Sequence, residues 1–232
     1  MSSKNPLKRL YDGREFPSLQ DGRVALLCID IQYLDAAYGH GCFANLPAGL
    51  EPDLAYYFDR LDHTVVPNVR RFQDGFRSAE QEVIHTRIQS LTQDGRDRSL
   101  EHKRLGLHAA PGSKEAEFLP AVAPQGDEIV IPKTASGVFS CTNLDYVLRN
   151  LGMTQLVMVG VLTNECVETA ARVAADQGYL VYIPEDGAAT VHPDLHQDSL
   201  EAMRHTYACI TSTEEILSQV QGLSMTMPAS VS

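Results

Sequence analysis

Short apolar runs alternate with helical stretches along this chain, and this alternation constrains its fold more than any other feature. Val24 to Asp30 and Gln155 to Gly160 are apolar almost throughout, as in strands that are covered on both faces of a parallel sheet. The remaining predicted strands are Gln81 to Thr86, Asp127 to Ile131, Tyr179 to Ile183 and Tyr207 to Thr211. Alternating strands and helices form parallel sheets with helices on both faces. The sequence therefore predicts an α/β fold with a doubly wound, six-stranded, mainly parallel sheet.

Helices are expected between these strands. The longest, Ala55 to Ala79, contains Pro67, which should bend or break it. The others are Thr142 to Leu151, Asn164 to Gln177, Pro193 to His205 and a last helix that begins at the Ser212/Thr213 cap. No linker divides the 232 residues, so we predict one domain over residues 1–232, with an N-terminal extension (1–23) and a loose tail (222–232).

Composition narrows the class of protein. Hydrophobic residues make up 44% of the chain and charged residues 21%, which is enough apolar material for a sizeable core. The formal charge of −11 argues against nucleic acid and anionic membrane surfaces as partners. Five cysteines without a CxxC motif indicate reduced thiols. The chain has no signal-peptide core and no apolar run near the ~18 residues of a membrane span, so we expect a cytoplasmic protein.

Cys166 lies in the first turn of the helix that is expected directly after the strand Gln155 to Gly160. A thiol there is surrounded by unpaired backbone N–H groups at the positive end of the helix dipole, which stabilise its thiolate. Strand, turn, nucleophile and helix together are similar in layout to a nucleophile elbow. The alternative is an inert packing residue, because free cysteine is among the most buried residue types.

Two charged residues stand at the ends of other predicted strands. Asp30 ends the first strand, and Lys133 follows the third one after Pro132. In doubly wound sheets, ligands bind outside the carboxyl ends of the strands, so Asp30, Lys133 and Cys166 are expected at one edge. Taken singly, Asp30 could be a helix cap or a surface carboxylate, and Lys133 a solvated lysine. Together they predict a nucleophile with an acid/base partner.

Three segments carry a resemblance to a known family. They are LLCIDIQ, which ends at Gln32; the pair Pro132-Lys133 with SGVFSCTNLDYVLRNLG after it; and VGVLTNECVETAARVAADQGYLVYIPEDGAAT. In order and separation they resemble the isochorismatase-like cysteine hydrolases over roughly Val24 to Ile216. The region from His85 to Gly112 looks most like the ureido- and biuret-type amidohydrolases of that family.

The resemblance implies a catalytic triad of Asp30, Lys133 and Cys166. Asp30 would take the proton of the thiol, and Lys133 would hold Asp30 in place. The resemblance also implies a non-proline cis peptide bond between Val161 and Leu162, with the N–H groups of Leu162 and Cys166 as the oxyanion hole. Members of the family often form homodimers or homotetramers, which we expect here too.

The same resemblance bears on chemistry and metal content. Most members hydrolyse amides or ureides through a covalent cysteine intermediate, whereas isochorismatases cleave a vinyl ether and lack the cysteine. Because Cys166 is present, we expect cleavage of a C–N bond in a small amide or ureido compound, of the biuret, triuret, ureidoacrylate or N-carbamoyl type. Nicotinamidases carry an Asp-x-His metal motif. The loop after the first strand has one His40 and no such motif, so we expect no metal and no cofactor. His192 and His196 are expected to form a surface pair.

Candidate substrate contacts come from three places. The long loop Gln32 to Asp53 offers several polar and aromatic side chains, the second strand leads to an arginine, and a phenylalanine follows Lys133. These candidates are Gln32, Tyr33, Tyr38, Phe43, Arg87 and Phe139. For the aromatic residues the alternative is core packing. For Arg87 and the basic segment behind it, which includes His102, the alternative is solvated surface.

Other functions stay open on sequence alone. Within enzymes, these are a vinyl-ether hydrolase, a nicotinamidase-like amidase and a simple aliphatic amidase; ammonia release separates amide from ether chemistry. Outside enzymes, the chain could be a catalytically idle scaffold, or a thiol redox sensor that pairs Cys166 with Cys141 and forms a disulfide with peroxide.

Overall fold

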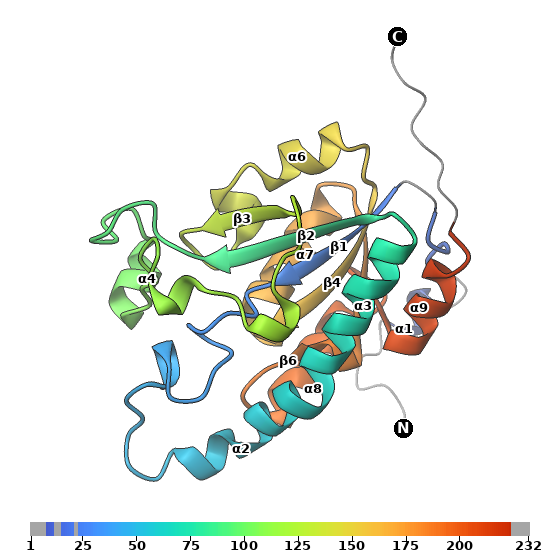
Figure 1. Cartoon of the computed structure of the whole chain (residues 1–232). Coiled ribbons are helices and arrows are strands. Elements are labelled where there is room, and N and C mark those ends of the chain that lie inside the picture. The colour runs from blue at the N-terminus through green and yellow to red at the C-terminus, as the bar shows by residue number, and fades with distance from the viewer. Residues whose placement is uncertain (1–7, 12–14, 21–22, 224–232) are drawn as a thin grey trace.

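The sheet winds in both directions from its central strands (Figure 1). The computed structural model describes residues 8–11, 15–20 and 23–223. Within them lies a seven-stranded parallel sheet of order β3-β2-β1-β4-β5-β7, with the two-residue β6 beside β4. The chain moves outward from β1 to β3 and then returns to the other side of β1, so the switch in strand order lies between β1 and β4. The predicted doubly wound α/β fold is confirmed, with β6 as an additional strand.

The strand bounds follow the predicted apolar runs closely. They are β1 (Val24–Ile29), β2 (Glu82–Ile88), β3 (Ile129–Lys133), β4 (Gln155–Val161), β5 (Leu180–Pro184), β6 (Ala188–Ala189) and β7 (Cys209–Thr211). β3 lies two residues later than predicted, so Lys133 ends the strand instead of following it. Pro132 fits inside β3 because this strand is at the edge of the sheet, where a missing N–H breaks no ladder on the open side.

Helices bury an apolar stripe on each face of the sheet. One face is covered by α5 (Val138–Cys141), α6 (Leu144–Asn150), α7 (Glu168–Asp176) and α8 (Pro193–Met203). The other is covered by α2 (Glu51–Arg60), α3 (Val66–Ser78) and α9 (Thr213–Val220). Two short helices, α1 (Lys8–Tyr11) and α4 (Leu100–Leu105), complete the described helices. Figure 1 places α4 beyond the tip of the β2 arrow, outside the carboxyl ends of the strands.

The long helix that was expected over Ala55 to Ala79 is interrupted ahead of its proline. A π-helical turn, Leu61–Val65, separates α2 from α3. Pro67 has no N–H to donate to the preceding turn, which disfavours a regular helix there. The Val66 N–H donates to the Leu61 carbonyl, five residues back, and the chain enters α3 with one wider turn.

Part of the N-terminal extension packs on the sheet. The Tyr182 hydroxyl donates to the Pro17 carbonyl at 2.5 Å, the Gln155 amide donates to the Ser18 carbonyl at 3.0 Å, and Leu19 is buried. The predicted tail lies outside the described residues from position 224 onward.

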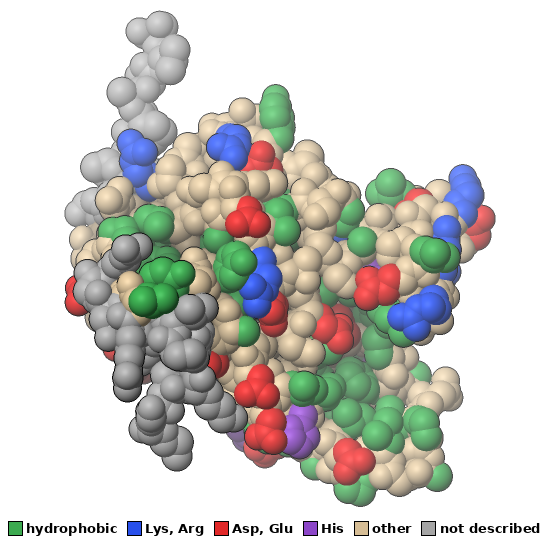
Figure 2. All heavy atoms as spheres, turned by 180° about the vertical axis from the view of Figure 1, so that it is seen from behind, with side chains coloured by type: hydrophobic (Ala, Val, Ile, Leu, Met, Phe, Trp, Pro, Cys, Tyr) green, Lys and Arg blue, Asp and Glu red, His purple; other side chains and the backbone are tan. Residues whose placement is uncertain are grey.

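No helix in the described ranges is both long and apolar enough to span a membrane. Figure 2 shows acidic side chains scattered over one face of the molecule.

Candidate active site

Asp30 is held in a buried, unusual conformation at the end of β1. Its φ of +54° lies in the left-handed region, which few residues other than glycine, asparagine and aspartate adopt, and its side chain is fully buried. Two contacts to β2 fix it: the Asp30 N–H donates to the Thr86 carbonyl at 3.1 Å, and the Thr86 hydroxyl donates to Asp30 Oδ1 at 2.8 Å. The carboxylate is therefore turned away from the regular strand direction and positioned by its neighbour.

Lys133 joins the acid to the cysteine. Its Nζ lies 2.8 Å from Asp30 Oδ2 and donates to Cys166 Sγ at 3.2 Å. It also donates to the carbonyl oxygens of Ala135 and Ser136, each at 3.1 Å. Burial opposes the charge of this fully enclosed ammonium, but the charge of Asp30 and the contact with Cys166 outweigh burial and raise the pKa of Lys133. Lys133 is thus a permanent cation between the carboxylate and the sulfur.

Cys166 lies on a π-helical turn, Thr163–Val167, that connects β4 to α7. Such turns occur often at functional sites. The sequence predicted a lowered thiol pKa from the helix N-terminus, and this is wrong for the side chain as placed. Burial raises the pKa of Cys166; the charge of Lys133 lowers it, and the fields of Asp30 and Asp35 raise it further. The resting sulfur is accordingly a thiol.

A polar network holds the turn that carries Cys166. The imidazole of His196 on α8 contacts the Thr163 hydroxyl through Nδ1 at 2.9 Å, and its Nε2 lies 3.1 Å from both Arg60 and the Glu185 carbonyl. Because His196 is only 2% exposed, the predicted surface pair of His192 and His196 is wrong: helical spacing alone did not show which face of α8 packs inward. Burial and the charge of Arg60 lower the pKa of His196 to about 4.

The peptide bond between Val161 and Leu162 is cis, as the resemblance implied. It lies at the carboxyl end of β4, directly before the turn of Cys166. The Leu162 carbonyl accepts hydrogen bonds from the N–H groups of Glu165 and Val167, which ties the turn to the end of the strand. The N–H groups of Leu162 and Cys166 remain our predicted oxyanion hole.

The side chain of Gln32 binds backbone groups of the protein and is not open to substrate. Its amide N–H groups donate to the carbonyls of Ile88 (2.9 Å) and Glu115 (2.7 Å), and its Oε1 accepts from the Ile88 N–H at 2.6 Å. The side chain is completely buried. These three bonds fasten the loop after β1 to the end of β2, so the amide groups that we expected to meet substrate are already engaged.

The other predicted contact residues are spread over the molecule. Phe43 packs on the rings of α2, and Phe139 packs against Tyr179, so both belong to the core. Arg87 lies inside β2, next to Thr86 and hence on the opposite face of the sheet; it donates to the Ala116 carbonyl and stacks on Phe118. Tyr33 is covered by Lys114, whose Nζ is 3.8 Å from the ring centre, and Tyr38 is 59% exposed.

Sequence reasoning missed Asp35 and His102. Both are buried, and both are close enough to Asp30 and Lys133 for these charges to act on their pKa values. Asp35 could have been found from its place five residues after Asp30 in the same loop. His102 could not, because a single histidine in a basic segment carries no periodicity that indicates burial.

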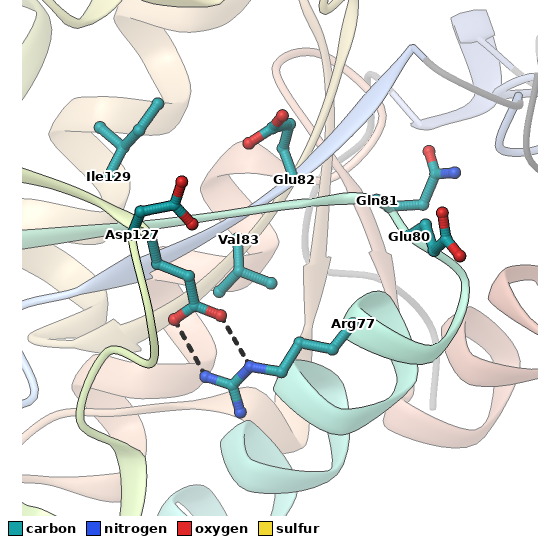
Figure 3. Close-up of a pocket in the computed structure, with 8 residues that line it drawn as sticks. Arg77, Glu80, Gln81, Glu82, Val83, Asp127 and Ile129 are labelled. Atoms are coloured by element: carbon teal, nitrogen blue, oxygen red, sulfur yellow. Dashed lines mark hydrogen bonds and ion pairs between the residues drawn. The ribbon is translucent and has the colours of Figure 1, made fainter. Parts of the chain in front are cut away.

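The described residues contain no group of three or more histidine, cysteine or carboxylate side chains placed to hold a metal ion. A pocket of about 450 Å³ lies elsewhere, at the amino ends of β2 and β3 (Figure 3). Arg77 pairs there with Glu128 through Nε at 2.7 Å, beside Glu80 and Glu82. This pocket is at the opposite edge of the sheet from Cys166 and does not belong to the site.

Fold and site together define a class: a doubly wound α/β enzyme with a buried cysteine at the carboxyl edge of its sheet. The Isochorismatase domain model matches residues 24–215. The chain therefore belongs to the isochorismatase family, among its isochorismatase-like cysteine hydrolases.

Relatives and solved structures agree with this family. Nicotinamidase 3 of Arabidopsis thaliana is 24% identical over 186 residues, which cover 77% of this chain and 91% of that protein. Ureidoacrylate amidohydrolase RutB of Agrobacterium fabrum is 37% identical over 94 residues, or 40% of this chain and 41% of that protein. A cysteine hydrolase from Pseudomonas syringae pv. phaseolicola 1448A shares the fold with a TM-score of 0.71 at 22% identity, covering 90% of this chain and 99% of that one.

Proposed function

We propose that this protein is a cysteine-dependent amidohydrolase that cleaves a carbon–nitrogen bond other than a peptide bond in a small amide or ureido compound. The observation that carries the proposal is the position of Lys133 Nζ, 2.8 Å from Asp30 and 3.2 Å from Cys166. A nucleophile, a proton acceptor and a fixed cation are thereby in direct contact inside a buried site.

The reaction begins with the thiol, because burial raises the pKa of Cys166. As sulfur attacks the carbonyl carbon, the thiol proton moves to Asp30 and the carbonyl π electrons move to oxygen. Lys133 stabilises the negative charge that develops on sulfur. The N–H groups of Leu162 and Cys166 are our candidates for binding the oxyanion.

Collapse of the tetrahedral intermediate breaks the C–N bond. Asp30 returns the proton to the departing nitrogen, which leaves as ammonia or an amine, and the acyl group remains on Cys166 as a thioester. Asp30 then takes a proton from water as the water oxygen attacks the thioester. The second intermediate expels the sulfur, which regains the proton from Asp30. One water is consumed in each turnover, and the enzyme returns to its starting state.

The relatives support amide chemistry over ether chemistry. Among them are proteins named nicotinamidase and ureidoacrylate amidohydrolase, and one named maleamate amidohydrolase. The buried Asp30–Lys133 pair also favours hydrolysis over a thiol redox sensor, since disulfide formation between Cys166 and Cys141 requires no fixed carboxylate.

The test is ammonia release by protein prepared without added metal. The panel comprises biuret, triuret, ureidoacrylate, N-carbamoyl amino acids, nicotinamide and simple amides, with Cys166→Ala as the control. We expect turnover of an amide or ureide that the substitution abolishes and that a chelator leaves unchanged. Folded protein that releases ammonia from none of these compounds would refute the proposal.

A further inference from the structure

Two buried polar side chains next to the triad have atoms without a hydrogen-bond partner. They are Asp35, through Oδ1, and His102, through both ring nitrogens. Asp35 is 8% exposed and His102 is fully enclosed. A buried polar group without a partner is costly, and a native structure that keeps one has a use for it.

His102 is the only side chain that α4 buries; its five other residues point to solvent or the rim, and Leu100 is 82% exposed. The helix is fastened beside the triad, because the Ser99 N–H donates to the carbonyl of Thr134, the residue after Lys133. A helix that packed by hydrophobic burial would turn a leucine inward. This one turns an imidazole inward instead.

The surroundings of His102 favour its neutral imidazole. Burial lowers its pKa, and the charge of Lys133 lowers it further. A neutral imidazole carries one N–H donor and one nitrogen acceptor, and both are unused here. The ring therefore offers a donor and an acceptor to a molecule that is bound at the triad.

Asp35 lies in the loop after β1, close enough to Asp30 and Lys133 for their charges to act on its carboxyl group. Its backbone carbonyl accepts a hydrogen bond from the Tyr57 hydroxyl at 2.5 Å, which fixes the loop, while Oδ1 stays unpaired. Burial raises the pKa of Asp35, and so do the nearby charges of Asp30 and Glu165. These effects favour the protonated, neutral form of the Asp35 carboxyl group. In that form it can accept and donate hydrogen bonds as an amide does.

The surrounding charge is unfavourable to an anionic ligand. Glu165 lies close enough to Glu101 and to Lys133 for both charges to act on it, and Glu101 also lies close enough to act on His102. The two cations that act on His102 are already engaged: Lys133 with four partners, and Arg98 with the carbonyls of Gly95 and Leu107. A substrate carboxylate would meet acidic groups instead of an available cation.

We propose that His102 and Asp35 are substrate contacts, and that they select an uncharged, N–H-rich amide or ureide without a carboxylate group. This inference rests on the proposed amidohydrolase function and narrows its substrate class. It excludes ureido acids as preferred substrates and favours compounds with an amide group at both ends.

The first test uses a matched pair of ligands, N-carbamoylglycinamide and N-carbamoylglycine, which differ only in a carboxamide and a carboxylate. Calorimetric titration of the Cys166→Ala protein measures binding without turnover. We expect the neutral amide to bind at least about ten-fold more tightly. In Asp35→Leu/Cys166→Ala protein, which loses the donor and the acceptor of this carboxyl group, that ratio should shrink. Equal binding of the pair, tighter binding of the acid, or no binding of either compound would overturn the proposal.

The second test uses His102→Leu, in the Cys166→Ala background for binding and alone for turnover. We expect about ten- to hundred-fold weaker binding of N-carbamoylglycinamide, because a buried hydrogen bond is lost. The melting temperature should stay level or rise, since a buried unpaired polar group is removed. The control is His63→Leu, whose side chain is 75% exposed and which should leave binding unchanged. Unaltered binding in His102→Leu, or a clear fall in its melting temperature, would contradict the assignment.

The two proposals fail in different ways. If wild-type protein releases no ammonia from any compound while Cys166→Ala binds the neutral amide through His102, the reaction is wrong and the contacts stand. If ammonia is released and depends on Cys166, but the carboxylate compound is preferred, the reaction stands and the selectivity is wrong.

Discussion

Lys133 determines the electrostatics of the site at the scale of single residues. Its ammonium and the Asp30 carboxylate are both fully buried and 2.8 Å apart. Each charge is tolerated there only because the other is present. The sulfur of Cys166, by contrast, is neutral at rest and depends on this pair only during the reaction.

Replacing one member of the pair should therefore destabilise the protein more than replacing both. We expect Lys133→Met to lower the free energy of unfolding by about 3–5 kcal/mol and to abolish turnover, because Asp30 is left buried and unpaired. The double variant Asp30→Asn/Lys133→Met should regain most of that stability without any activity. Urea unfolding of Lys133→Met, of Asp30→Asn and of the double variant measures this coupling. Losses that simply add would show that the two charges do not depend on each other.

His196 gives a prediction for pH. Its pKa is lowered to about 4 in the folded protein from an ordinary value near 6.5, so the unfolded chain binds its proton first as the pH falls. The contribution of neutral His196 to the free energy of unfolding is therefore fully present above about pH 6.5. As the pH falls from there to about 4, the free energy of unfolding decreases by up to about 3 kcal/mol.

The measurement is the free energy of unfolding at pH 7.5, 6 and 5 for wild type and His196→Asn. Asn keeps some hydrogen bonds to Thr163 and Arg60 but does not titrate, so its stability should fall less steeply with acid. Because His85 and His102 also have lowered pKa values, the difference between the two curves is the informative quantity. Parallel curves would exclude His196 as the source.

At the scale of elements, the close approach of β1 and β4 places Asp30 next to the turn of Cys166. Ile29 and Gly160 are register partners, and Gly160 has a φ of +125°. A Cβ at Gly160 would lie 2.0 Å from the Ile29 carbonyl oxygen, which is a backbone atom and cannot move aside. Only glycine permits this approach.

Gly160→Ala should therefore prevent folding or cost more than about 4 kcal/mol. Gly152→Ala is the matched control, because Gly152 also has a positive φ (+74°) but has nothing within 4 Å of an added Cβ. It should cost only about 1 kcal/mol. Soluble yield and thermal unfolding compare the two variants. Similar melting temperatures would show that β1 and β4 can separate at little cost.

Elements of this fold were predictable where one local signal was sufficient. Strands buried on both faces read as continuous apolar runs, and the predicted Ser212/Thr213 cap marks the start of α9, where the structure has a capping box. The position of β3 was less certain, because Pro132 suggested an end where an edge strand continues. β6 has two residues, too few for a pattern.

Site residues were predictable where they follow a strand and unpredictable where tertiary contacts decide. Asp30, Lys133 and Cys166 meet because parallel strands end at one edge. Gln32 looked available for substrate, but its amide satisfies backbone groups of β2 and of Glu115, two segments distant in sequence. Arg87 was assigned to the loop after β2, whereas the strand continues to Ile88 and turns Arg87 to the other face. Neither the contacts of Gln32 nor the orientation of Arg87 could be found from local sequence.

At the scale of the whole molecule, exposed apolar side chains gather around α4. Leu100 is 82% exposed, Leu91 70% and Leu105 51%. Figure 2 shows hydrophobic, basic and acidic side chains together on the projecting part of the molecule that carries this helix. Apolar side chains grouped in this way mark interaction surfaces. We propose that this surface joins subunits of a homodimer or homotetramer.

The expected mass in solution is two or four times that of the 25.5 kDa chain. Substituting Leu100→Glu and Leu105→Glu together should dissociate the assembly, because a carboxylate buried in an apolar interface lacks a partner. The control is Tyr146→Glu, since Tyr146 is 68% exposed on α6, away from α4. Light scattering after size-exclusion chromatography measures all three proteins. Because α4 also carries His102, the dissociated variant should bind N-carbamoylglycinamide less tightly than the Tyr146→Glu protein does. A wild-type protein with the mass of one chain would show that α4 stays in place without a neighbouring subunit.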